Sequence, residues 1–142
     1  MSDQVTLFPL EFFLEGAPVS HQASARSKER WKATVKASAH SRVQETVDWS
    51  FLDNRPVAVT IFYFPPGDMA GDVGNIVKPI LDGMTNVAYP DDQVVERVLV
   101  QKFEPGIQRS SANASDILED ALRTTAPVVY IRVDDDLSLR DL

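Results

Sequence analysis

Five charged residues between Asp72 and Asp92 have the types and the order that phosphodiester chemistry requires. Asp72 lies in a glycine-rich stretch, Lys78 and Asp82 follow it, and Asp91 and Asp92 come after a second short stretch. Carboxylate oxygens are preferred ligands of Mg²⁺, and an ion held by them activates a water and neutralises charge on a phosphate. The segment therefore predicts a magnesium-binding carboxylate site for cutting DNA.

The composition restricts any metal to oxygen ligands. The 142-residue chain has no cysteine and only two histidines, His21 and His40, which excludes a disulfide framework, a thiolate zinc site and a histidine-rich cage. No apolar run approaches the ~20 residues that span a bilayer, and no secretory signal pattern opens the chain. We expect one cytoplasmic domain over residues 1–142, without a membrane partner and with a flexible acidic tail at 133–142.

The distribution of charge favours a phosphate-contacting helix. The net charge of −7 by itself counts against a nucleic-acid partner. From Ser20 to Arg42, however, six basic residues accompany one acid, so this segment carries +5 and the remainder −12. Helical spacing of apolar and basic residues predicts a helix over Ser27–Val43, which is either a phosphate-binding surface or a solvated face. The expected DNA-binding side chains are Arg26, Lys28, Arg30, Lys32 and Lys36.

The remaining elements must position these residues. Strands are expected over Val5–Leu14, Val57–Phe64, Val94–Glu104 and Val128–Val133, and further helices over Ile76–Met84 and Ser115–Arg123, with Asn113 or Ser115 as the cap of the last helix. Because the strands are mixed in polarity, the order predicts an α+β domain with a mixed β-sheet packed by helices mainly on one side. The expected core includes Phe12, Trp31, Phe62, Val94, Val98, Val100 and Phe103.

Each polar feature of the site also has a purely structural interpretation. Asp72 before a helix is typical of a cap, and Lys78 with Asp82 at i, i+4 is typical of a surface ion pair. A Pro-Asp-Asp turn between elements is commonplace. The conjunction of all three features in this order is much less common, and it favours the functional interpretation.

A resemblance to the RusA family of Holliday-junction resolvases rests on the run Asp72-Val-Gly-Asn75-Ile-Val-Lys78-Pro-Ile-Leu-Asp82 and on Asp91-Asp92-Gln93-Val94 after it. Residues Pro18–Gln22 and Ser27–Lys32 are similar to the family's opening loop and first helix. The resemblance covers roughly residues 10–104. It implies a RusA-like fold and a crossover junction endodeoxyribonuclease that acts in DNA recombination and repair.

The resemblance also implies roles for the matching residues. Asp72 and the last metal ligand, Asp91 or Asp92, would bind Mg²⁺ or Mn²⁺. The spacing to the glutamine selects Asp91, whereas the position within the pair selects Asp92, so both are candidates. Lys78 would act in catalysis through the scissile phosphate or the transition-state charge. The supporting residues would be Asn75 and Asp82.

The substrate implied by the resemblance is a four-way DNA junction, cut by paired symmetric nicks. Because this junction has two-fold symmetry, a homodimer would present two sites related by the same operator. The partners expected from the sequence are therefore branched DNA and a second copy of the chain.

One position departs from the family pattern. The second aspartate of the motif falls on Gly74, which brings no carboxylate. Three accounts are open: another aspartate such as Asp82 substitutes, the protein binds branched DNA without cutting it, or the chain is an altered, weakened copy. A regulatory or protein-interaction domain that never meets DNA is the competing class, motivated by the net charge of −7.

Overall fold

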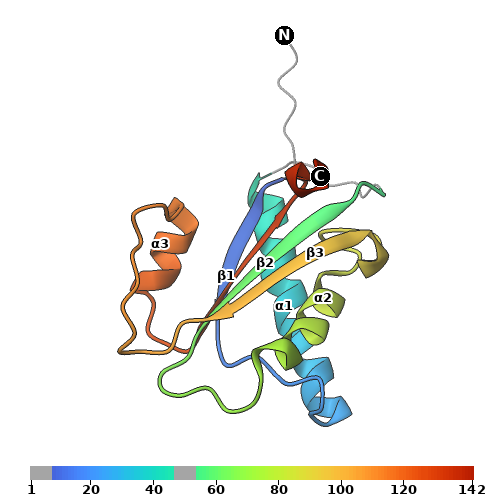
Figure 1. The fold of residues 1–142 in the computed structure, drawn as a ribbon. Coiled ribbons are helices and arrows are strands. Elements are labelled where there is room, and N and C mark those ends of the chain that lie inside the picture. The colour runs from blue at the N-terminus through green and yellow to red at the C-terminus, as the bar shows by residue number, and fades with distance from the viewer. Residues whose placement is uncertain (1–7, 47–53) are drawn as a thin grey trace.

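A four-stranded mixed sheet forms the centre of the computed structural model, which describes residues 8–46 and 54–142 (Figure 1). The strands are Leu10–Glu15 (β1), Val57–Phe64 (β2), Val95–Lys102 (β3) and Val128–Asp134 (β4). In the order β1-β4-β2-β3, β4 pairs antiparallel with β1 and β2, and β3 pairs parallel with β2. The predicted mixed sheet is confirmed, whereas positions 5–7 of the first predicted strand lie outside the described residues.

Helices cover both faces of this sheet unequally. The helices α1 (Ala25–Thr46) and α2 (Val77–Met84) pack on the main core, whereas α3 (Asp116–Arg123) packs on the opposite face (Figure 1). Successive strand residues point to opposite faces, so Phe12 joins the core under α1 and α2 while Phe13 contacts the α3 cluster. The α+β prediction is confirmed, with two helices on one face and one on the other.

The helices form where capping and apolar spacing favour them. Four residues at i, i+4, i+8 and i+12 of α1 are buried: Trp31, Val35, Ala39 and Val43. A short 3₁₀ helix, Val73–Ile76, precedes α2, and Pro79 lies in the first turn of α2, where proline is tolerated. Ser115, not Asn113, caps α3, because its Oγ accepts a hydrogen bond from the Leu118 amide at 3.1 Å.

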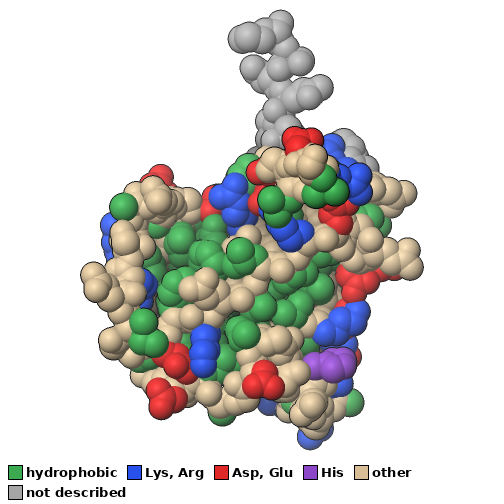
Figure 2. All heavy atoms as spheres, in the orientation of Figure 1, with side chains coloured by type: hydrophobic (Ala, Val, Ile, Leu, Met, Phe, Trp, Pro, Cys, Tyr) green, Lys and Arg blue, Asp and Glu red, His purple; other side chains and the backbone are tan. Residues whose placement is uncertain are grey.

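The edge strand β3 is more exposed than its sequence suggests. Val98 is 36% exposed and Leu99 is 47% exposed, so the prediction that Val98 belongs to the core is wrong. Val94 ends the short 3₁₀ helix Asp92–Val94 and is partly buried, as are Val100 and Phe103. Figure 2 shows many apolar side chains on the sheet face beside α3, which α3 covers only in part. Among the described helices, none has both the length and the apolarity to cross a membrane.

The C-terminal segment contacts the sheet. β4 continues to the buried Asp134, one residue beyond its predicted end, and a 3₁₀ helix follows over Ser138–Arg140. The Arg140 guanidinium donates two hydrogen bonds to Glu96 at 2.8 and 2.6 Å. This bidentate pair connects the acidic tail to β3, and the flexibility of the tail stays a prediction.

Gly83 sets the distance between α1 and α2. A Cβ atom built at this position would lie 2.8 Å from Val35 Cβ and 3.0 Å from the Lys32 carbonyl oxygen. We expect Gly83→Ala to lower the free energy of unfolding by about 1–3 kcal/mol, since backbone or side-chain displacement must relieve the overlap. Urea denaturation measures the effect.

Two further variants make this test specific. Gly67→Ala is a matched control, because a Cβ at Gly67 meets no atom within 4 Å. Gly83→Ala should also cost somewhat less in a Val35→Ala background, which removes the Cγ1 methyl at 2.9 Å but keeps Val35 Cβ and the Lys32 carbonyl oxygen. A loss of stability in Gly83→Ala no larger than in Gly67→Ala would show that close helix packing is not the cause.

Candidate active site

Asp72 lies directly before a short helix, and its carboxylate makes no capping hydrogen bond to that helix. Its backbone is extended, and its carbonyl oxygen accepts a hydrogen bond from the Asn75 amide at 3.0 Å. The Asp72 side chain makes no cap hydrogen bond to the 3₁₀ helix Val73–Ile76 and is exposed. Asp72 therefore occupies the N-cap position, as the alternative interpretation predicts, but its carboxylate does not cap the helix.

Lys78 joins two aspartates that are separate in the sequence. Its Nζ lies 2.9 Å from Asp82 Oδ1, one turn along α2, so the predicted i, i+4 ion pair is present. The same Nζ lies 2.5 Å from Asp92 Oδ2, in the loop before β3. One ammonium thus contacts two carboxylates, whereas a simple surface ion pair joins one cation to one anion.

The structure distinguishes Asp91 from Asp92. Asp91 is the N-cap of the 3₁₀ helix Asp92–Val94, and its Oδ1 accepts a hydrogen bond from the Gln93 amide at 3.1 Å. Asp92 turns toward Lys78, and its side chain is 26% exposed. Of the two candidates left by the sequence, Asp92 is therefore the one that contacts the rest of the site.

Tyr89 is buried beside the Pro-Asp-Asp turn and is missing from the residues expected from the sequence. Its side chain is buried, and its hydroxyl donates a hydrogen bond to the Leu81 carbonyl oxygen at 2.7 Å. Burial raises the pKa of Tyr89 far above its usual value, and the charges of Asp92, Asp82 and Asp91 raise it further. All three aspartates therefore act on one buried hydroxyl. The only sequence signal for Tyr89 is its place directly before the Pro-Asp-Asp turn.

The Lys78 hydrogen bonds hold both partners in their charged forms. The hydrogen bonds that Lys78 donates to Asp92 and then to Asp82 hold the pKa of Lys78 well above its usual value, so it is a fixed cation at neutral pH. The Lys78 hydrogen bond also holds the pKa of Asp92 below its usual 3.8. Because its pKa is raised, Lys78 can stabilise negative charge but cannot act as a general base at neutral pH.

The lowered pKa of Asp92 predicts a pH dependence of stability. A carboxyl group with a depressed folded-state pKa adds stability that is present above its unfolded value, about pH 4, and lost as pH falls through its folded value. We expect the free energy of unfolding to fall more steeply between about pH 5 and pH 2 in the parent protein than in Asp92→Asn. Lys78→Met should flatten the curve similarly, and parallel curves for all three proteins would contradict the prediction.

The donor set can be compared with what magnesium requires. Within residues 8–46 and 54–142, no three His, Cys, Asp or Glu side chains are grouped so as to hold a metal ion. Magnesium often uses only one or two carboxylates and takes its other ligands from water and substrate phosphate. Asp92 pairs with Lys78 and Asp82 pairs with both Lys78 and Lys32, so a divalent cation would have to be bound together with water and substrate phosphate.

The predicted DNA-binding residues of α1 divide into two sets. Arg26 and Arg30 are exposed. Each of the three lysines contacts a group of the protein itself: Lys28 the His21 carbonyl, Lys32 the carboxylates of Glu29 and Asp82, and Lys36 the Thr85 carbonyl. The sequence spacing of the lysines does not reveal these contacts.

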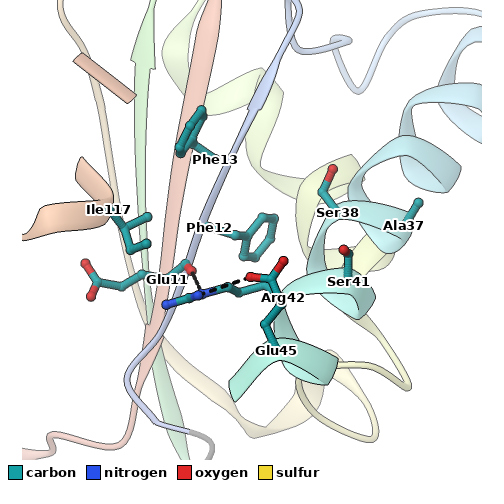
Figure 3. Close-up of a pocket in the computed structure, with 9 residues that line it drawn as sticks. All are labelled: Glu11, Phe12, Phe13, Ala37, Ser38, Ser41, Arg42, Glu45 and Ile117. Carbon is teal, nitrogen blue, oxygen red and sulfur yellow. Dashed lines mark hydrogen bonds and ion pairs between the residues drawn. The ribbon is translucent and has the colours of Figure 1, made fainter. Parts of the chain in front are cut away.

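A cavity elsewhere offers no comparable chemistry. A hollow of about 440 Å³ lies between β1, α1 and α3 (Figure 3). Arg42 lies across it, donating a hydrogen bond from Nε to the Glu11 carbonyl oxygen at 3.0 Å and pairing with Glu45 at 3.3 Å. The Glu11 carboxylate is engaged by Ser115 and Tyr130, so these polar groups hold elements together.

The fold and the site together define a class of protein. The segment before the edge strand of the mixed sheet holds a lysine between two aspartates, an arrangement that can stabilise charge on a phosphate. A family model described as endodeoxyribonuclease RusA matches residues 19–110, more than half of the chain and the whole of this site. The chain belongs to the RusA family, as the sequence resemblance predicts. No curated protein matches the chain.

Proposed function

We propose that this protein is a magnesium- or manganese-dependent endonuclease that resolves four-way DNA junctions by paired nicks. RusA-family proteins are Holliday-junction resolvases. The observation that carries the proposal is the Lys78 ammonium, which lies within 2.9 Å of Asp82 and 2.5 Å of Asp92 inside the segment matched to the family. An exposed, fixed cation among aspartates can bind a phosphate and stabilise the charge of its transition state.

Each residue of the site has a proposed role. Asp72 and Asp92, with Asp91 beside them, would hold the divalent cation, whose chemistry is to activate a water and to neutralise charge on the phosphate. Lys78 is half-exposed and bears its charge throughout the neutral range, so it is placed to bind the scissile phosphate. Asp82 orients Lys78 from the next turn of α2, and Asn75 supports the loop before it.

The assembly and the location are part of the same proposal. A homodimer would present two sites to the two-fold symmetric junction and so allow symmetric nicks. Such a protein would act on DNA in the cytoplasm, in recombination and repair. Crosslinking with size-exclusion chromatography would test for the dimer.

Purified protein, a synthetic four-way junction and Mg²⁺ or Mn²⁺ provide the main test. We expect paired nicks in the junction, none in linear duplexes of the same sequence, and loss of nicking in Asp72→Asn. Absence of nicking by both the parent protein and Gly74→Asp would overturn the proposal.

A second candidate function follows from Gly74. With one carboxylate fewer than the family pattern, the protein would bind branched DNA without cutting it. This alternative predicts a salt-dependent junction preference in a gel shift, no nicks by the parent protein, and nicking restored by Gly74→Asp.

A further inference from the structure

The three lysines of α1 are connected to one continuous stretch of the site, residues 75–85, here called the site segment, two of them directly and one through His21. They lie at i, i+4 and i+8, so they project from one side of α1. Lys32 Nζ lies 3.7 Å from Asp82 Oδ2, and Lys36 Nζ donates a hydrogen bond to the Thr85 carbonyl oxygen at 2.8 Å. The middle and the end of the site segment are thereby tied to α1.

Lys28 reaches the start of the same segment through one intermediate residue. Its Nζ donates a hydrogen bond to the His21 carbonyl oxygen at 3.1 Å. The His21 amide in turn donates to the Asn75 carbonyl oxygen at 2.6 Å. The order of the lysines along α1 therefore matches the order of their targets along the site segment.

The central contact connects α1 electrostatically to the site. Asp82 uses Oδ2 for Lys32 and Oδ1 for Lys78, and Lys78 continues to Asp92. The Lys32 and Asp82 side chains are only 28% and 29% exposed, so this pair is better shielded from solvent than a typical surface ion pair. Without the Lys32 charge, Asp82 would attract Lys78 alone, and the position of Lys78 relative to Asp92 would change.

The contact at Thr85 has a separate physical basis. The last carbonyl groups of a helix lack intrahelical partners and lie at the negative end of its dipole. Thr85 is the residue directly after α2, and the Lys36 ammonium satisfies its carbonyl oxygen. Lys36 therefore fixes the end of α2.

The exposed arginines differ from the lysines in position. Arg26 and Arg30 also lie at i, i+4, but they are offset by two residues from Lys28, about 200° around a helix. Their side chains project from the side of α1 away from the site segment and are exposed. Both arginines are therefore available to a phosphate backbone.

We infer that Lys28, Lys32 and Lys36 are positioning residues, which hold the site segment in register against α1, and that Arg26 and Arg30 make the phosphate contacts. The part of this inference that concerns DNA rests on the proposed function. The part that concerns the protein alone does not. The two parts are therefore measured separately.

Amide hydrogen exchange of the free protein tests the positioning role. We expect Lys32→Met and Lys36→Met to speed exchange across the site segment by roughly tenfold, because local opening requires less free energy when a holding contact is lost. Lys36→Arg keeps a donor for Thr85 and should preserve slow exchange. Arg30→Gln and the surface control Arg123→Gln, on α3, should leave the site segment unchanged.

Junction binding and cleavage test whether the arginines contact DNA while the lysines position the site segment. Arg26→Gln and Arg30→Gln should each reduce the slope of log K against log salt concentration by about 1. Lys32→Met should leave this slope unchanged and lower kcat by roughly tenfold. Arg123→Gln should change neither.

Two results would overturn the inference: lysine variants that reduce the salt slope by about 1, and lysine variants with parent-like exchange in the site segment. If neither the parent protein nor any variant binds DNA, the proposed function fails. The exchange experiment still decides whether the lysines position the site segment.

Discussion

Replacing Asp92 by asparagine is expected to slow junction cleavage by roughly 10²–10³-fold, whereas Asp91→Asn is expected to cost less than roughly tenfold. The reason is that the two neighbouring side chains have different partners. Asp92 lies 2.5 Å from the Lys78 ammonium, and its negative charge is part of the site. Asp91 accepts a hydrogen bond from the Gln93 amide, a contact that an asparagine oxygen can also accept.

Single-turnover cleavage with saturating enzyme and Mg²⁺ measures this difference at the chemical step. Circular dichroism melting of both variants serves as the control for folding. Equal losses of rate in the two variants, or a larger loss in Asp91→Asn, would show that Asp92 is not the principal carboxylate of the pair.

Gly74→Asp is expected to increase Mn²⁺ affinity by at least roughly tenfold and to raise the rate of junction cleavage, because it adds a carboxylate to the site. The backbone permits the change. A Cβ at Gly74 meets no atom within 4 Å, and unlike Gly71, with φ +80°, Gly74 is outside the left-handed region. The substitution should therefore fold without strain.

Electron paramagnetic resonance of free Mn²⁺ measures the affinity independently of activity. Gly67→Asp is the matched control, since it adds the same charge at another open glycine outside the motif. Unchanged affinity in Gly74→Asp, or the same increase in both variants, would show that residue 74 does not point a carboxylate at the metal.

Strand and helix positions followed closely from the sequence where local forces decide them. Val57–Phe64 is a run of β-branched and aromatic residues, and the structure has the strand with the same bounds. Ser115 caps its helix by a contact that spans three residues. Such features depend on neighbours in the chain, so the sequence contains the information needed to predict them.

Val98 shows where this reasoning fails. It lies in an apolar strand pattern, yet it is 36% exposed because β3 is at the edge of the sheet and, among the described strands, pairs only with β2. Alternation along a strand indicates which residues share a face, but not whether another strand or helix covers that face. The position of a strand in the sheet is a property of the whole fold.

By itself, the sequence determined the family, the order of the elements and the set of polar residues from Asp72 to Asp92. Only the tertiary structure decided which of them meet. Lys78 and Asp92 are brought together by the path of the chain through α2 and the following loop, and the α1 lysines meet the site segment by helix packing. Charged groups act over a few ångströms in space, and sequence separation does not specify such distances.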